Sequence, residues 1–458
     1  MTKTFQLNWL AAAIGTLLLT GCGDAETTIV EQDPIEVPGD DHDDDHNHDD
    51  GLIDSLGRLA VTSAESNEAV IYDLDDNSLL DTFPLTHESS AVSSSAGYRY
   101  AVFTTRTQDH VGFIDGGLWR EDHVDHLHDY EQAPVMSDYA LSGSRPTHVV
   151  THDGKMAVFY DGDAEAGTTA SVQVVNDTDI SSETADLPTL PYNINMHGVA
   201  EPRGEHLLAT IRRDDALNTS ANKVLPDQIG VFHWHDGEYE QEQVLEVDCP
   251  DLHGAAQNVD YNAFGCSDGI MVAHQHDTEY HAVKIPNVES LGGLRVGSIF
   301  AHEDSDSFFG VASQHSGGAA ILVNINPVEN DMEMVDWEPA TDAQAISYSY
   351  SADGDHFLIL DNQGFLTVLT PHDHDGHSHW EFDKRINISE EDVATMPEGQ
   401  SFSMAISYSS NIVYVADPIA QHVLAIDLES SETVSDIPLD FAPAGIAWMG
   451  IPETEHAH

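Results

Sequence analysis

The feature that most constrains the fold is a weak repeat of about fifty residues, in which a strand, a turn and a second strand recur. The clearest copies cover residues 147–159, 196–209 and 252–265, and weaker copies begin near residues 91, 297, 345 and 404. A third strand usually follows. Such repeats are typical of propeller blades. The sequence therefore predicts an all-β fold, a β-propeller of eight blades. Seven blades is the alternative, because the weaker copies are easily miscounted.

The two ends of this region predict that the ring is closed by N- and C-terminal strands. Residues 58–61, 69–72 and 79–82 resemble the second to fourth strands of a blade that lacks its first. Residues 445–448 resemble that missing strand. Their pairing would protect the sheet edges. We therefore expect a propeller over residues 52–450 and a C-terminal tail over 451–458.

The N-terminus has the pattern of an export signal. Lys3 precedes an apolar stretch over residues 9–19, which is too short for a stable membrane span. The stretch ends at Leu-Thr-Gly-Cys22, the form of a bacterial lipobox. We expect a lipoprotein signal peptide over residues 1–21, a lipid on Cys22 and a periplasmic protein anchored to the inner or outer membrane. An ordinary signal peptide with a chance cysteine is the alternative.

Residues 22–51 predict a disordered tether, because they are acidic, poor in aromatic residues and broken by Pro34 and Pro38. His42, His46 and His48 stand among carboxylates in this tether. Interchangeable imidazoles there suit a borderline-soft ion that is captured and released quickly. Calcium binding by the carboxylates alone is a weaker alternative, since it leaves the histidines unexplained.

The net charge and the histidine content limit the classes of function that this protein can have. The chain has 15 Lys and Arg against 81 Asp and Glu, which gives a formal net charge of −66. Nucleic-acid binding is excluded, because phosphate contacts need basic patches. The 28 histidines exceed what folding requires. Imidazole is the commonest metal ligand in proteins, so the composition points to metal binding.

The densest histidine cluster inside the predicted propeller contains His123, Asp125, His126 and His128, after the strand at residues 111–115. Three imidazoles and a carboxylate would satisfy a tetrahedral Zn²⁺ ion. Side chains alternate along a strand, so His126 and His128 would share a face and a turn would bring the other two to them. A solvated His/Asp loop without a metal is the alternative.

A second set of histidines becomes visible only when the repeats are aligned. His148, His197 and His253 take equivalent positions at the start of the innermost strand in three successive blades. We expect them to meet at the mouth of the central channel, as metal ligands or as polar filling. Two shorter pairs, His233 with His235 and His274 with His276, are expected to be exposed surface histidines.

Cys22 is assigned to lipidation, which leaves Cys249 and Cys266 as a pair in a compartment that permits disulfides. We expect a disulfide between them, with two buried free thiols as the alternative.

Signatures of catalysis are absent from the sequence. It contains no Gly-x-Ser-x-Gly elbow, no phosphate-binding loop and no dinucleotide fingerprint. We therefore expect that the protein is not an enzyme. The alternative is a metal-dependent hydrolase on a lactonase-like propeller, in which the metal would activate water.

Several segments together resemble the AztD-type periplasmic zinc metallochaperones. They are the His-rich tether, residues 113–117 with 123–128, residues 196–200, residues 249–254 and residues 264–266. The resemblance implies a β-propeller that binds Zn²⁺ and passes it to the solute-binding protein of a zinc ABC importer. The lipobox and the very high acidity depart from that family's pattern.

Overall fold

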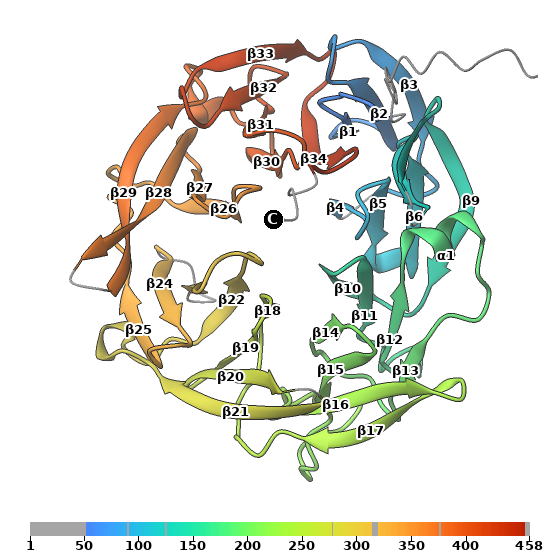
Figure 1. Cartoon of the computed structure of the whole chain (residues 1–458), viewed down its shortest axis with the longest axis vertical. Coiled ribbons are helices and arrows are strands. Elements are labelled where there is room, and N and C mark those ends of the chain that lie inside the picture. Colours follow the sequence, from blue (N-terminus) through green and yellow to red (C-terminus); the bar gives the residue numbers. More distant parts are fainter. Residues whose placement is uncertain are drawn as a thin grey trace, which may run out of the picture. The chain divides into compact units, whose positions relative to one another are not determined.

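The computed structural model describes residues 52–88, 91–123, 126–276, 278–313, 319–374 and 377–453. In this part of the chain, 34 strands form eight four-stranded antiparallel sheets and one two-stranded hairpin. The sheets stand around a ring, each with its first strand towards the centre (Figure 1). The predicted eight-bladed β-propeller is confirmed, and the seven-bladed alternative is excluded.

Blades 1 to 4 contain the following strands. Blade 1 comprises β4 (Ala91–Ser94), β5 (Tyr100–Thr105), β6 (His110–Asp115) and β9 (Val135–Ser142). Blade 2 comprises β10 (Pro146–His152), β11 (Lys155–Tyr160), β12 (Ser171–Val175) and β13 (Thr189–Pro191). Blade 3 comprises β14 (Ala200–Arg203), β15 (His206–Ile211), β16 (Gln228–His235) and β17 (Glu238–Val244). Blade 4 comprises β18 (Ala255–Gln257), β19 (Tyr261–Cys266), β20 (Gly269–His276) and β21 (Glu279–Pro286).

Blades 5 to 8 complete the ring. Blade 5 comprises β22 (Val296–Phe300), β23 (Phe308–Ala312), β24 (Ile321–Asn326) and β25 (Asp331–Met334). Blade 6 comprises β26 (Ala345–Tyr350), β27 (Phe357–Asp361), β28 (Phe365–His374) and β29 (His377–Asn387). Blade 7 comprises β30 (Ser403–Ile406), β31 (Ile412–Asp417), β32 (His422–Asp427) and β33 (Thr433–Pro438). Blade 8 comprises β34 (Pro443–Met449), β1 (Arg58–Ser63), β2 (Glu68–Asp73) and β3 (Leu79–Pro84).

Helices are few and short among the described residues. The α-helix α1 (Asp177–Ser181) follows β12, and its N-cap Asn176 accepts a hydrogen bond from the amide of Asp179. The 3₁₀ helices are η1 (Arg106–Gln108), η2 (Glu289–Leu291) and η3 (Val393–Thr395). No helix of the described residues is long and apolar enough to cross a membrane.

The core of the propeller lies between its blades. Eight apolar clusters are buried, one at each interface between neighbouring sheets. Strands such as β11 and β5 therefore bury almost every residue, because both of their faces are covered. Each blade needs its neighbours to bury its faces, so closure of the ring matters for stability.

Closure occurs in blade 8, as predicted. β34 pairs with β1 in an antiparallel ladder from Met449↔Arg58 to Gly445↔Thr62. The buried Trp448 also donates its indole N–H to the carbonyl of Leu56, at 2.9 Å. Segments almost four hundred residues apart thus share one sheet.

The ring has two faces, defined here by the innermost strands. Face A is the end at which these strands begin, and face B is the end at which they finish. Successive strands of a blade are antiparallel. Turns between first and second strands, and between third and fourth strands, therefore lie on face B.

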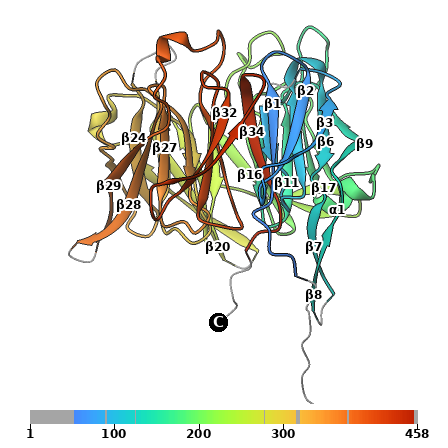
Figure 2. The same ribbon diagram turned by 90° about the horizontal axis from the view of Figure 1, so that it is seen from above.

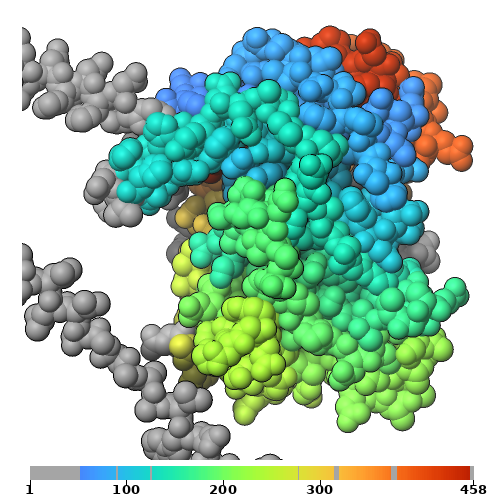
Figure 3. All heavy atoms as spheres, turned by 90° about the vertical axis from the view of Figure 1, so that its right-hand side faces the viewer, coloured from blue at the N-terminus to red at the C-terminus, as the bar shows by residue number. Residues whose placement is uncertain are grey.

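A hairpin of β7 (Leu118–Asp122) and β8 (Leu127–Glu131) leaves blade 1 between its third and fourth strands, so it lies on face B. It projects away from the ring on that side (Figure 2). The space-filling view shows this teal region protruding at the edge of the molecule (Figure 3). The amide of Ile53, near the start of the described chain, donates to Asp129 of the hairpin at 2.8 Å.

Candidate metal centre

Three histidines meet at face A, near the ring centre. His148 is the third residue of β10, whereas His197 precedes β14 by three residues and His253 precedes β18 by two. The alignment of repeats predicted all three at strand starts, and this is wrong for the last two, which lie in the loops that enter the strands. The strands β10, β14 and β18 are adjacent innermost strands (Figure 1). The loops that enter β14 and β18 therefore still bring the imidazoles together.

The imidazoles, called here the triad, are close enough to share one ion. One ring nitrogen from each lies within 4.8 Å of the other two, and the residues are partly buried. The Nε2 atoms of His148 and His197 are 3.3 Å apart. Two ligands of a tetrahedral Zn²⁺ ion, each about 2.0–2.1 Å from the metal, lie about 3.3 Å apart. The triad is the only group of three or more His, Cys, Asp or Glu residues that satisfies this closeness in the described chain.

A buried carboxylate orients His197. The Nδ1 of His197 lies 3.1 Å from Oδ2 of Asp161, which is 1% exposed at the end of β11. Arg106 donates to the same carboxylate at 3.0 Å. Donation from Nδ1 leaves an acceptor lone pair on Nε2 of a neutral imidazole. A carboxylate behind a histidine in this way is the usual partner of a metal-ligating imidazole.

The backbone of blade 5 orients His253. Its Nδ1 donates to the carbonyl of Gly297 at 2.8 Å, so the lone pair of the neutral ring is again on Nε2. The ring centroids of His197 and His253 are 5.0 Å apart, and those of His148 and His253 are 5.9 Å apart.

Glycine follows two of the three histidines because the loops leave no room for a side chain. A Cβ on Gly198 would collide with the hydroxyl of Thr210 and approach the ring of Phe159 to 2.8 Å. Gly254 has φ of +79°, and a Cβ there would lie 2.6 Å from the carbonyl oxygen of Gly297. That carbonyl holds His253, so the glycine permits the contact that orients the imidazole.

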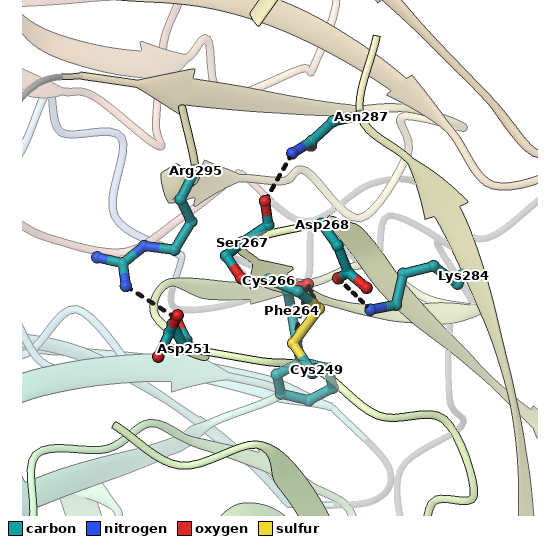
Figure 4. The surroundings of a disulfide bond; sticks show 9 residues. All are labelled: Cys249, Asp251, Phe264, Cys266, Ser267, Asp268, Lys284, Asn287 and Arg295. Atoms are coloured by element: carbon teal, nitrogen blue, oxygen red, sulfur yellow. Dashed lines mark hydrogen bonds and ion pairs between the residues drawn. A yellow bond between two sulfur atoms is a disulfide. The ribbon is translucent and has the colours of Figure 1, made fainter. Parts of the chain in front are cut away.

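A disulfide fixes the loop that carries His253. Cys249 and Cys266 are bonded as expected, and both are fully buried (Figure 4). His253 lies between them in sequence, and its amide donates to the carbonyl of Gly265 at 2.9 Å. Arg295 of blade 5 donates to the carbonyl of Asp251 in the same loop, at 2.8 Å. The loop therefore has few ways to move its imidazole out of place.

The electrostatics of the triad favour a neutral imidazole at His148. Burial, with smaller contributions from His197 and His253, lowers the pKa of His148 to about 4. Burial on its own would raise the pKa of Asp161, but the hydrogen bonds from His197 and Arg106 hold that pKa below its usual value. The site thus presents an uncharged His148 ring to a cation and holds the negative charge of Asp161 behind His197.

The 123–128 cluster stands on the β7–β8 hairpin, on the opposite face. Asp125 lies outside the described residues. The ring of His123 is 5.5 Å from that of His126 and 6.2 Å from that of His128, measured between centroids. His126 precedes β8, so strand alternation does not place it beside His128 as expected. A metal site on this hairpin stays a prediction.

Sequence reasoning missed the groups that orient the triad, namely Asp161, Arg106 and the carbonyl of Gly297. A signal for Asp161 exists in the repeat. An aspartate also ends or follows the second strand of other blades, as Asp361 and Asp417, and all three are at most 1% exposed. The predicted sites in the export signal and the tether, at Cys22, His42, His46 and His48, lie outside the described residues.

Comparison with known proteins confirms the resemblance predicted from sequence. No family model matches the chain. The chain is 22% identical over 407 residues to the zinc chaperone AztD from Citrobacter koseri, covering 86% of each protein. That protein is named as a chaperone, which agrees with the expectation that this chain is not an enzyme.

Solved structures share the fold. The structure of apo AztD from Citrobacter koseri matches with a TM-score of 0.69 and 18% identity, over 87% of this chain and 99% of that one. A crystal structure of Citrobacter koseri AztD matches with a TM-score of 0.70 and 19% identity, again over 87% of this chain and 99% of that one. The dihydro-heme d1 dehydrogenase NirN matches with a TM-score of 0.55 and 12% identity, over 86% of this chain and 75% of that one. At these identities the likeness establishes the propeller fold.

Proposed function

We propose that this protein is a periplasmic zinc metallochaperone that holds Zn²⁺ at the triad and passes it to the solute-binding protein of a zinc ABC importer. The observation that carries the proposal is the convergence of His148, His197 and His253 at 4.8 Å or less between ligand atoms. The similarity to a protein named as a zinc chaperone supports the choice of metal and of role.

Three protein ligands suit a cargo site better than a permanent one. A structural Zn²⁺ site is closed by four protein ligands, whereas three leave one position open. A ligand from the acceptor can enter at that position before any triad histidine leaves. Transfer then proceeds by stepwise exchange of imidazoles, and no free aqua ion has to form.

The ligand set of the triad, three imidazoles, also limits how tightly the ion is held. No thiolate or carboxylate among the described residues joins the three ligand atoms in that group. The charge of Asp161 stabilises the ion from behind His197, and Arg106 offsets part of it. Such a balance suits an ion that must leave again.

The tether and the anchor have secondary roles in this proposal. His42, His46 and His48 capture or hand over the ion, and the lipid on Cys22 holds the protein at a membrane. The hairpin lies on face B, where its Asp129 accepts a hydrogen bond from the amide of Ile53, whereas the triad lies on face A.

The test is direct transfer. The full-length protein is loaded with one equivalent of Zn²⁺, mixed with the metal-free solute-binding protein, and both proteins are separated and analysed for zinc over time. We expect transfer faster than release to a chelator of matched affinity. A variant without residues 42–48 should keep its tight zinc and transfer it more slowly.

Two outcomes would contradict this proposal. Transfer no faster than release to the chelator would mean that the ion passes through solution. A loaded protein that keeps its zinc and accelerates hydrolysis of a lactone would favour the metal-dependent hydrolase instead.

A further inference from the structure

We infer that residues 212–227, called here the blade 3 loop, are the surface on which the acceptor protein docks. The partner that this loop fits is an acidic protein surface with an apolar pocket. The inference rests on the proposed function, because it names the docking surface for that transfer. The loop connects the second and third strands of blade 3, so it lies on face A, as the triad does.

The blade 3 loop is an insertion that the other blades lack. It has sixteen residues without a helix or strand, whereas the equivalent connections of the other seven blades have two to ten residues. Its ends are closed, because Ile211 and Gln228 stand opposite each other in the ladder between β15 and β16. Compact loops of this kind, and insertions into one repeat, are frequently binding elements.

The start of the loop is held to the segment that carries His197. The amide of Thr210, near the end of β15, donates to the carbonyl of Val199 at 3.1 Å. Val199 is two residues from His197. Tyr192, from the same connection between blades 2 and 3, donates its hydroxyl to the carbonyl of Thr210 at 2.8 Å.

The end of the loop is held to the segment that carries His253. The amide of Leu252, which directly precedes His253, donates to the carbonyl of Pro226 at 2.9 Å. The amide of Cys249 donates to the carbonyl of Asp227 at 2.8 Å. The blade 3 loop therefore joins the segments that carry two of the three triad histidines, and a protein docked on it lies beside the ion.

The loop holds its shape through its own hydrogen bonds. Asn218 is 5% exposed, its side chain donates to the carbonyl of Arg213 at 3.0 Å, and its carbonyl accepts from Arg212 at 2.7 Å. The side chain of Asn222 donates to the carbonyl of Leu217 at 2.8 Å. A surface that is fixed before binding loses little conformational freedom when a partner arrives.

This fixed loop presents an apolar side chain and two cations. Leu217 is 67% exposed, the most exposed large apolar side chain of the described residues. Covering such a side chain with an apolar pocket is favourable. Lys223 is exposed, and the side chain of Arg213 is 29% exposed, with Asp227 at 3.3 Å.

The charge of the loop indicates the kind of partner. The loop has three basic and three acidic residues, whereas the whole chain has 15 basic and 81 acidic ones. A basic partner would be attracted to the acidic remainder of the surface and not to this loop. An acidic partner meets less repulsion here than on that remainder, and its carboxylates can pair with the exposed cations.

The test measures acceptor binding by two variants that each change one exposed side chain, Leu217→Asp and Lys223→Glu. The full-length, zinc-loaded protein is immobilised, and the metal-free solute-binding protein of the transfer test is passed over it. We expect each variant to bind this acceptor about tenfold more weakly than the wild type does, as is typical when a central interface contact is lost. Transfer of zinc should slow in the same order. Thermal melting checks that each variant is folded.

Val328→Asp is the matched control for Leu217→Asp. Val328 is 66% exposed and lies in the turn between the third and fourth strands of blade 5, on face B. The change in charge and the exposure are therefore the same as at Leu217, but the position is on the other face. This variant should bind the acceptor and transfer zinc as the wild type does.

Zinc titration against a chromophoric chelator separates docking from support of the triad. Both loop variants should keep the tight class of sites, meaning the zinc held at the triad, with an affinity within about threefold of the wild type. A loss of zinc affinity with unchanged acceptor binding would mean that the loop only supports the His253 segment, and it would overturn the inference. Equal acceptor binding by the wild type, Leu217→Asp and Lys223→Glu would overturn it as well.

Failure of this inference and failure of the proposed function are distinguishable, because docking is measured by binding alone. If the wild type binds the acceptor, both loop variants bind it more weakly, and zinc still moves no faster than to a chelator, the docking surface stands and direct transfer fails. If the wild type does not bind the acceptor at all, the docking inference is overturned, whatever the triad holds.

Discussion

The triad and the β7–β8 hairpin are both groups of three histidines, but they differ in how they are held. The triad histidines are about fifty residues apart in sequence, one per blade, and their rings are partly buried. The hairpin histidines fall within six residues, and the side chain of His123 is 43% exposed. The triad has a buried carboxylate and a backbone carbonyl behind two of its rings. His123 has the exposed Glu121 and the Tyr130 hydroxyl near it.

Histidine density in a sequence is therefore a poor guide to a preformed metal site. An exposed side chain must lose rotamer freedom when it binds a metal, and that loss opposes binding. A ring already fixed by its other nitrogen loses little. We therefore expect the dispersed histidines of the triad, and not the dense cluster, to hold the tight zinc.

The largest expected effect follows from breaking the triad. Replacing His148 and His197 with Ala removes two of three ligands, and we expect the tight site to weaken by at least about a thousandfold, since each lost metal ligand weakens binding far more than the 10–100-fold loss of an outer partner. Competition with a chelator of known affinity measures the change. If a folded variant still binds zinc tightly, the triad does not hold the tight zinc, and the β7–β8 hairpin becomes the better candidate.

The fold was predictable because its signals are local and repeated. Each blade repeats the same strand and turn pattern, and the lone strand at residues 445–448 fits the blade that lacks a first strand. The observed ladder between β34 and β1 confirms this pairing. The predicted disulfide is present too. The sequence alone did not indicate that this disulfide fixes the loop that carries His253.

The site was predictable only in part. The repeat aligned His148, His197 and His253, since equivalent positions in neighbouring blades are close in space. It did not reveal Asp161 or the Gly297 carbonyl as their partners, because those contacts run between blades.

The next largest effect should come from the group behind His197. In Asp161→Asn the amide keeps the size of the side chain and loses the charge, so we expect zinc affinity at the triad to fall by about 10–100-fold. Asp417→Asn is the matched control, because Asp417 ends a second strand in blade 7 and is 0% exposed. Equal zinc affinities in the two variants would show that orientation of His197 does not matter.

A smaller effect concerns the stability of the metal-free protein. Burial lowers the pKa of His148 to about 4, whereas the unfolded chain should titrate near 6.5. At pH values between these two pKa values, His148 binds a proton in the unfolded state and does not bind one in the folded state. The free energy of unfolding should therefore fall as pH drops from 6.5 towards 4, by about 1–3 kcal/mol from this residue. Urea unfolding in the presence of a chelator measures it, and His148→Gln should remove this part of the loss. An identical pH dependence in that variant would exclude His148 as the source.

The smallest effect on tight binding is expected from the hairpin. His126→Ala/His128→Ala should change the affinity of the tight site by less than about threefold, because the hairpin lies on face B and shares no contact with the triad among the described residues. Thermal stability should also change little, since surface substitutions usually shift stability by about 0.5 kcal/mol or less. Any zinc that the hairpin binds belongs to the weaker classes, so the total stoichiometry can fall while the tight class stays. The comparison is sharpest when the same titration includes the triad variant. If the hairpin variant loses the tight class and the triad variant keeps it, then the local cluster, completed by Asp125, is the cargo site. The partly buried imidazoles of the triad then fill the channel mouth.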